Sequence, residues 1–163
     1  MKPKIYIETS IISYLTARPS RDVLVNANQM LAKEWWTGYL DNFETFVSEV
    51  VITEIEKGDP EFAKLRLTAV KGIRALPLTN EAKSLAEEIL ARNILPAKAT
   101  VDVLHISIAS VNSMDFLLSL NCKHIANAFI YRRIRDVCRD LGYEPPIICT
   151  LQEILEKEKK IDD

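Results

Sequence analysis

Short apolar runs alternate with longer helical patterns along almost the whole of this 163-residue chain. The runs have the length and β-branched composition of strands, while the segments between them repeat apolar residues at helical spacing. Strands separated by helices predict a mainly parallel sheet covered on both faces, so the expected fold is a three-layer α/β/α sandwich. The expected strands are 4–7, 44–48, 73–78, 115–120 and 146–150, and the expected helices are 20–40, 49–58, 59–72, 80–93, 99–113, 125–142 and 151–160.

Residues suited to helix ends support these boundaries. Ser20, Asp59 and Thr79 are expected N-caps, and Pro60 stands at a first helical position. Glycines at positions 58, 72 and 142 fit helix ends. Since no repeat or low-complexity linker divides the chain, we expect a single domain over 1–163, with a charged end that frays over about 157–163.

Composition narrows the class of protein. Apolar residues make up 48% of the chain and the formal charge is −2, which argues against disorder and against a strongly basic nucleic-acid binder, although a local basic patch is compatible with it. No apolar run approaches the roughly 20 residues of a membrane span, and no long apolar stretch follows the start, so we expect a cytoplasmic protein. Three cysteines without CxxC spacing predict reduced, buried thiols.

The stretch KIYIETSIISYL places Glu8 directly after the first expected strand. A carboxylate beside a core strand costs several kcal/mol of desolvation unless something compensates it. Ligands of parallel sheets gather beyond the carboxyl ends of the strands, and Asn121 follows the fourth strand at that same edge. Asp115 precedes the fourth strand, so we expect it at the opposite end of the sheet.

Two more acids occupy awkward places. Glu54 falls on the helix face that Val50 and Val51 should bury, and Asp102 stands near the start of an almost uniformly apolar helix. Each acid alone has a structural explanation: Glu8 could cap the next helix, Glu54 could be exposed, and Asp102 could only stabilise a helix N-terminus. Three acids from three segments that converged would repel one another and favour a cation. Without a zinc-type His/Cys set, Mg²⁺ or Mn²⁺ is expected.

Four segments together resemble the PIN-domain family, and within it the toxin ribonucleases of toxin–antitoxin pairs. These segments are IYIETSIISYL, VSEVVITEIEKGD, TVDVLHISIASVNSMDFLLSLNCKHIANA and PIICTLQEIL, and their order and spacing cover nearly the whole chain. The resemblance implies a PIN-like fold and an endoribonuclease that hydrolyses RNA phosphodiester bonds with Mg²⁺ or Mn²⁺. It also implies a homodimer that a small antitoxin protein neutralises.

The resemblance assigns metal binding to Glu8, Glu54 and Asp102. It places a supporting hydroxyl at Thr9 or Ser10, and Ser10 is expected to contact the metal's waters or the phosphate. Glu54 could instead orient the attacking water as a general base.

Two departures from the family pattern affect the predicted catalytic set Glu8, Glu54, Asp102 and Asn121. Glu8 stands where Asp is usual, and Asn121 stands where many members carry a fourth Asp. The alternative function is therefore a catalytically weakened PIN-like module that binds RNA or protein. Aspartyl-phosphate phosphotransfer is disfavoured, because no second acid stands two residues after Glu8.

Basic residues and histidines add further candidates. Arg132, Arg135 and Arg139 share one helix face, which either is solvated or binds phosphate or an acidic antitoxin segment; Arg132 and Arg135 are the predicted substrate contacts. His105 lies one turn after Asp102 and is either a hydrogen-bonded core residue or part of the site. His124 either meets a phosphate or starts a helix.

Overall fold

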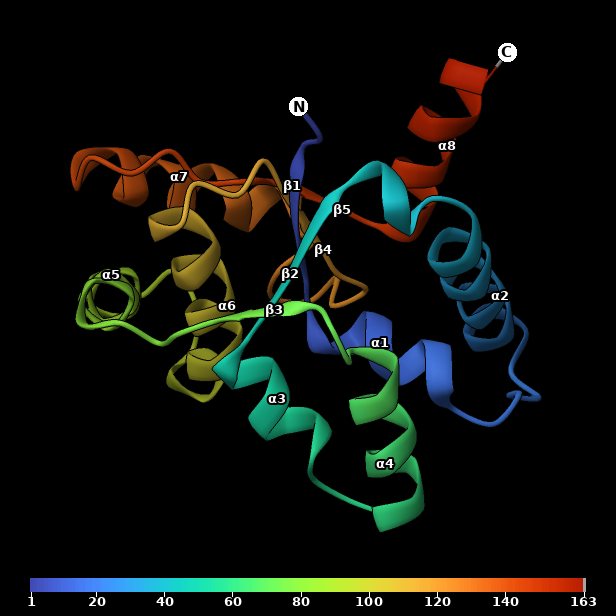
Figure 1. The fold of residues 1–163 in the computed structure, drawn as a ribbon. Helices are drawn as coiled ribbons and strands as arrows, with labels where there is room; N and C mark the ends of the chain where they lie inside the picture. Colours follow the sequence, from blue (N-terminus) through green and yellow to red (C-terminus); the bar gives the residue numbers. More distant parts are fainter. Residues whose placement is uncertain (163) are drawn as a thin grey trace.

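The computed structural model describes residues 1–162 (Figure 1). The strands are β1 (Lys4–Ile7), β2 (Glu44–Ser48), β3 (Arg74–Leu76), β4 (Phe116–Leu118) and β5 (Ile147–Cys149). The helices are α1 (Thr9–Thr16), α2 (Val23–Gly38), α3 (Glu49–Ile55), α4 (Pro60–Ala69), α5 (Asn80–Ala91), α6 (Thr100–Val111), α7 (Ala128–Asp140) and α8 (Leu151–Asp162), with short 3-10 turns at η1 (Leu40–Asn42) and η2 (Ala97–Ala99).

The five strands form one sheet in the order β3-β2-β1-β4-β5, and every neighbouring pair is parallel. All strands therefore end at the same edge. Helices α5 and α6 lie on one side of the sheet and α2 and α8 on the other (Figure 1). The predicted α/β sandwich with a parallel sheet is confirmed.

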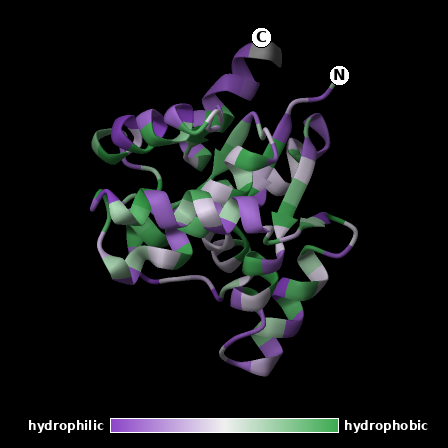
Figure 2. Cartoon of the chain, turned by 90° about the vertical axis from the view of Figure 1, so that its left-hand side faces the viewer, coloured by the Kyte–Doolittle hydropathy of each residue, from purple (hydrophilic) through white to green (hydrophobic). Residues whose placement is uncertain are grey.

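The core is built from the central strands and the helices that cover them. Ile5 and Ile7 of β1 and Ile106 and Ile108 of α6 are fully buried. Figure 2 shows hydrophobic residues concentrated in the strands, while the helices alternate hydrophobic and hydrophilic residues along their length. This is the pattern expected when a parallel sheet is buried on both faces.

Most predicted helix ends are confirmed. Asp59 Oδ1 accepts a hydrogen bond from the Glu61 amide at 2.9 Å, and Thr79 Oγ1 accepts one from Ala82 at 3.2 Å. The three glycines expected after helices have left-handed φ angles of 87°, 88° and 84°, at Gly58, Gly72 and Gly142. These conformations favour glycine, since it carries no Cβ.

The predicted cap of the first long helix is wrong. Helix α2 begins at Val23, and Asp22 caps it by accepting a hydrogen bond from Val25 N at 2.9 Å. Ser20 lies two residues before the cap, where its hydroxyl accepts a hydrogen bond from the Asp22 amide at 3.1 Å and its own amide donates to Gln29 at 2.9 Å. Ser20 thus orders the turn that leads into the helix.

The cysteines are free, as predicted, but only two of them are buried. Burial raises the pKa of the Cys149 thiol to about 12 and also raises that of Cys138. The prediction of a buried thiol is wrong for Cys122, which is exposed in the loop after β4. That loop also carries Asn121 and His124, which are both partly exposed.

The charged C-terminal segment is helical as far as the described residues go, because α8 continues to Asp162. Asp163 lies outside the described residues. A single domain and a fraying end both stay predictions. None of the described helices is both long enough and apolar enough to cross a membrane.

Candidate metal centre

The end of β1 holds Glu8 at the carboxyl edge of the sheet. The Glu8 amide donates to Leu118 O at 3.0 Å, so the pairing with β4 continues one residue beyond Ile7. Helix α1 begins immediately afterwards at Thr9, and Glu8 occupies its N-cap position. The Glu8 carboxylate makes no cap hydrogen bond, and the residue as a whole is 5% exposed. The explanation of Glu8 as a helix cap therefore does not account for its carboxylate.

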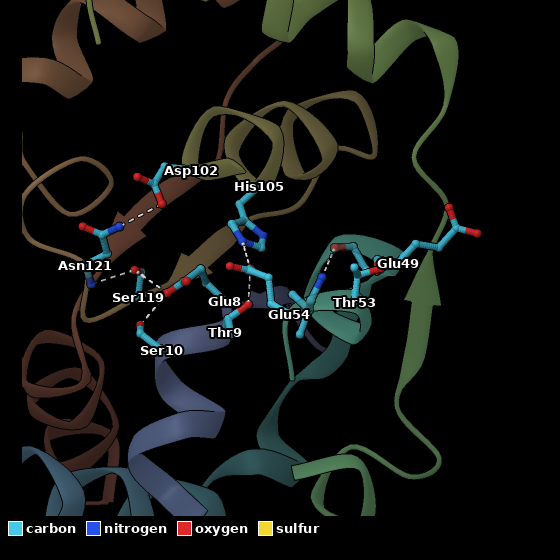
Figure 3. Close-up of polar contacts among 12 residues, drawn as sticks. Glu8, Thr9, Ser10, Glu49, Thr53, Glu54, Asp102, His105, Ser119 and Asn121 are labelled. Carbon is cyan, nitrogen blue, oxygen red and sulfur yellow. Dashed lines mark hydrogen bonds and ion pairs between the residues drawn. The ribbon is translucent and has the colours of Figure 1, made fainter. Parts of the chain in front are cut away.

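Two serines bind the Glu8 carboxylate and link it to the loop after β4 (Figure 3). Both the Ser10 hydroxyl and the Ser119 hydroxyl, the latter at 2.8 Å, donate to Glu8 Oε2. Ser10 Oγ also accepts from Leu120 N at 2.9 Å, and Ser119 Oγ accepts from Asn121 N at 3.0 Å. One carboxylate oxygen is thus fixed by hydroxyl donors that the loop itself orients.

Glu54 reaches the same place from α3. Its Oε1 accepts from the Thr9 hydroxyl at 2.6 Å and lies 2.7 Å from His105 Nε2. Partial burial by itself would raise the pKa of Glu54, but the hydrogen bonds from His105 and Thr9 outweigh it, so the pKa lies below its ordinary value. Glu54 is therefore ionised at neutral pH.

Behind Glu54 lies a chain of buried polar groups. His105 Nδ1 is 2.7 Å from the Tyr6 hydroxyl, which is 2.7 Å from Ser48 Oγ. His105, Tyr6 and Ser48 are all fully buried, and Ser48 is also the N-cap of α3. Burial raises the pKa of Tyr6 above its ordinary range. His105 is thus a hydrogen-bonded core residue that also reaches the site, so both readings of this residue hold.

Glu8, Glu54 and His105 form one compact group whose possible ligand atoms all lie within 4.8 Å of one another. They come from the end of β1, from α3 and from α6. Two carboxylates this close repel each other unless a cation or a proton compensates them. The geometry is therefore suited to a cation.

Asp102 lies outside this compact group and belongs to a second group, with Asn121 and His124. Its Oδ1 accepts from Asn121 Nδ2 at 3.0 Å, and its Oδ2 lies 2.7 Å from His124 Nδ1. The His124 amide in turn donates to Asn121 Oδ1 at 3.2 Å. The hydroxyl of Thr100, the first residue of α6, donates to Ala97 O at 2.6 Å. Asp102 is thus engaged by the loop after β4.

The predicted arginines of α7 make no direct hydrogen bond to the candidate acids within the described residues. Arg132 and Arg135 lie on α7, and neither makes a hydrogen bond to Glu8, Glu54 or Asp102 within the described part of the chain. Arg139 of the same face pairs with Glu144 through two hydrogen bonds, at 2.9 and 2.6 Å. The direct contacts therefore leave the phosphate-binding role of α7 without support.

Asp115 lies where it was expected, at the opposite end of the sheet. Its Oδ2 accepts from Lys4 N, the first residue of β1, at 2.7 Å. It therefore joins the two strands where they start and has no part in the site.

Ser119 was missed from the sequence, because the expected strand 115–120 included it. Ile7 pairs with Leu118 in the parallel register, so the next residue on each strand, Glu8 and Ser119, reaches the same edge. The pairing of the acid with this hydroxyl donor therefore follows from the observed end of β4 at Leu118 and from its register with β1.

A hollow of about 630 Å³ lies beside Glu54. Its walls come from α3, from Lys57 just after that helix, from Leu78 after β3, and from Val101 and Leu104 of α6. A separate hollow of about 680 Å³ lies between α7 and α8 and is lined by none of the candidate acids. Glu54 of the compact group lines the first of these two hollows, and none of the three residues of the group lines the second.

Comparison with known proteins places the fold. No family model and no curated protein matches the chain. The structure of VapBC2 from Rickettsia felis bound to a promoter DNA fragment is similar, with a TM-score of 0.54 and 17% identity, covering 90% of this chain and 98% of that one. VapC20 of Mycobacterium tuberculosis, a toxin that cleaves the sarcin–ricin loop, has a TM-score of 0.56 and 16% identity. The similarity covers 73% of this chain and 91% of that one. The chain has a PIN-like fold, similar to that of VapC toxins.

At 16–17% identity the similarity is one of fold. It extends over most of this chain and includes the parallel five-stranded sheet whose edge carries the acids. The resemblance to PIN-domain toxins is therefore confirmed at the level of structure.

Proposed function

We propose that this chain is a Mg²⁺- or Mn²⁺-dependent endoribonuclease and the toxin of a toxin–antitoxin pair. The observation that carries the proposal is the convergence of Glu8, Glu54 and His105 within 4.8 Å, at the carboxyl edge of a sheet similar to that of VapC toxins. VapC20 is described as a toxin that cleaves the sarcin–ricin loop, which supports RNA as the substrate.

The two carboxylates of the compact group have the chemistry that a hard cation requires. Glu8 uses Oε2 for both of its serine donors, and Glu54 uses Oε1 for Thr9 and His105. Within the described residues, the other oxygen of each carboxylate accepts no hydrogen bond. One oxygen on each side is therefore available to a cation that prefers oxygen ligands and keeps several waters.

We propose that Glu8 and Glu54 hold this cation and that Asp102 completes the set, directly or through water. When bound, such an ion acidifies water and offsets negative charge on a phosphoryl group. Glu54 is kept ionised by its donors, so its oxygen can also accept a proton from an attacking water. The Ser10 hydroxyl holds Glu8 in position, and Asn121 holds Asp102.

RNA would lie along the carboxyl edge of the sheet, with a nucleotide in the hollow beside Glu54 and Lys57 near its phosphate. Ser10, Arg132 and Arg135 stay our candidates for substrate contacts. The similarity to VapBC2 supports a small antitoxin protein as partner. A homodimer stays part of the proposal.

One observation favours a second candidate, a catalytically weakened binding module. Asp102 is already engaged by the Asn121 amide and by His124, and Asn121 supplies no fourth negative charge. A site with fewer charges binds a divalent cation more weakly. The two candidates differ in whether RNA is cut or only bound.

The deciding experiment compares the wild type with Asp102→Ala and with Glu56→Gln. Glu56 is an exposed acid just after α3, so it provides a matched control for loss of a negative charge. Structured and single-stranded RNA would be incubated with Mg²⁺, Mn²⁺ or EDTA. We expect metal-dependent cleavage by the wild type and by Glu56→Gln only. Equal, metal-independent background from all three proteins would refute the nuclease, and RNA binding without cleavage would favour the second candidate.

A further inference from the structure

We propose that His105 is a positioning residue that presents a hydrogen on Nε2 to Glu54, and that the cap of helix α3 determines which ring nitrogen carries that hydrogen. This rests on the proposed function in so far as Glu54 acts in the reaction. The alternative role for His105, as a direct metal ligand, requires a free lone pair on Nε2.

The direction of the hydrogen bonds is set at one end by a backbone donor. The Val51 amide, which can only donate, points to Ser48 Oγ at 3.2 Å. Within the described residues the fully buried Ser48 hydroxyl has one other partner, the Tyr6 hydroxyl at 2.7 Å. The Ser48 hydrogen is therefore satisfied only if it points to Tyr6, and a buried hydrogen without an acceptor is unfavourable because it has lost its hydrogen bond to water.

The same reasoning fixes the next two bonds. Tyr6 accepts from Ser48, so its own hydrogen points to its remaining partner, His105 Nδ1, at 2.7 Å. Nδ1 then carries no hydrogen, and in the neutral ring the hydrogen resides on Nε2. Nε2 lies 2.7 Å from Glu54 Oε1 and donates to it. In this arrangement the hydrogens of Ser48, Tyr6 and His105 Nε2 all have acceptors.

The Glu54 end of this hydrogen-bonded series independently indicates the same direction of donation. An ionised carboxylate can only accept, and Glu54 Oε1 already accepts from the Thr9 hydroxyl at 2.6 Å. His105 must therefore be the donor. The Val51 amide at one end and the Glu54 carboxylate at the other therefore require the same direction of donation, from Ser48 through Tyr6 and His105 to Glu54.

This polarity assigns a role to each oxygen of Glu54. Oε1 is occupied by two donors, and Oε2 has no hydrogen-bond partner within the described residues. Since Nε2 carries a hydrogen, His105 does not coordinate a cation in this arrangement, although it lies within the compact group. His105 instead fixes the carboxylate so that Oε2 is the oxygen presented to a cation or to water.

The first test needs neither RNA nor metal. Nitrogen-15 NMR of the histidine rings in the metal-free protein at neutral pH should show His105 with a hydrogen on Nε2 and none on Nδ1. Tyr6→Phe removes the donor to Nδ1 and should shift the Nδ1 resonance or produce a mixture of tautomers. A hydrogen on Nδ1 in the wild type would overturn the proposal.

The second test uses two amide substitutions that place a donor at different positions. The amide nitrogen of His105→Gln lies near the position of Nε2 and can still donate to Glu54, whereas that of His105→Asn lies near Nδ1 and cannot. Losing a residue that orients a metal ligand typically costs about 10–100-fold in metal affinity or activity. We expect His105→Asn to lose about that much in Mn²⁺ affinity by calorimetry and in kcat, with KM for RNA unchanged, and His105→Gln to lose at least tenfold less.

Equal losses in the two variants would overturn the proposal, and equal abolition of Mn²⁺ binding would identify His105 as a ligand. Thermal unfolding of both variants shows whether each is folded. If neither variant folds, the NMR measurement of the His105 tautomer in the wild type still tests the proposal. A wild type that does not cut RNA would refute the proposed nuclease, while the tautomer and Mn²⁺ measurements still decide the role of His105.

Discussion

Two carboxylate–histidine pairs lie at the carboxyl edge of the sheet, and they differ in how they are held. His105 and Glu54 join at 2.7 Å, as do His124 and Asp102. The side chain of His105 is 1% exposed and bonded to the core through Tyr6, while that of His124 is 14% exposed on the loop after β4. The same pair of groups is thus fixed by the core in one case and by a loop in the other, so only the second can rearrange without disturbing the sheet.

The largest expected difference between the pairs is in catalysis. Glu54→Gln keeps the shape but removes the charge and the proton acceptor, so kcat for RNA cleavage should fall by about 10²–10⁴-fold. His124→Gln should cost less than about tenfold, because Asp102 keeps the donor from Asn121. Rates measured at saturating RNA with Mn²⁺ test this. Losses of similar size in both variants would mean that the loop pair is as rigid as the core pair.

The next difference is in stability. His105→Leu removes the acceptor of Tyr6 and a donor to Glu54 inside the core, and should cost about 2–3 kcal/mol of unfolding free energy. His124→Leu breaks a partly exposed pair and should cost less than about 1 kcal/mol. Urea unfolding of the two variants beside the wild type measures both values. A larger loss for His124→Leu would mean that the loop pair, and not the core pair, contributes more to stability.

Asn121→Asp sharpens the role of the loop. It replaces the amide that donates to Asp102 at 3.0 Å by a second carboxylate, so the two charges repel in the absence of a cation. We expect a loss of about 1 kcal/mol, or roughly 2–4 °C in melting temperature for a chain of this size. Added Mn²⁺ should recover more of the melting temperature in the variant than in the wild type. A variant as stable as the wild type in EDTA would contradict this.

The smallest effect is the pH dependence of the core pair. The pKa of Glu54 in the folded chain lies below the ordinary 4.5, so between these two values the unfolded chain binds more protons. The stabilisation is complete above about pH 4.5 and is lost as the pH falls through the folded pKa. Glu54→Gln should therefore flatten the acid side of the stability curve. Melting temperatures measured from pH 6 to pH 3 test this, and parallel curves would refute it.

The fold and the edge that carries the site were predictable from the sequence, because they depend on strand and helix periodicity. Glu8 and Asn121 each follow a buried strand, and parallel strands end together. Glu54 was predictable from its helical spacing to Val50 and Val51, of which Val51 is fully buried and Val50 partly exposed. These are local patterns that the topology then brings together.

What the sequence did not predict depends on contacts between distant segments. Ser48 is the last residue of β2, Tyr6 lies on β1 and His105 on α6, and no spacing along the chain indicates that their polar atoms meet. Likewise, the sequence does not indicate that Asp102 turns to the loop after β4 and away from the compact group. The Ser20 cap failed because Asp22, two residues later, is an equally good cap.

The uneven burial of the three thiols makes the site observable without adding any residue. Cys138 and Cys149 are buried and their pKa values are raised, so both react slowly with alkylating reagents, while the exposed Cys122 directly follows Asn121. One equivalent of a maleimide dye should therefore label a single known position. Its fluorescence would report, in the natural sequence, whether the loop that engages Asp102 moves when Mn²⁺ or RNA is added.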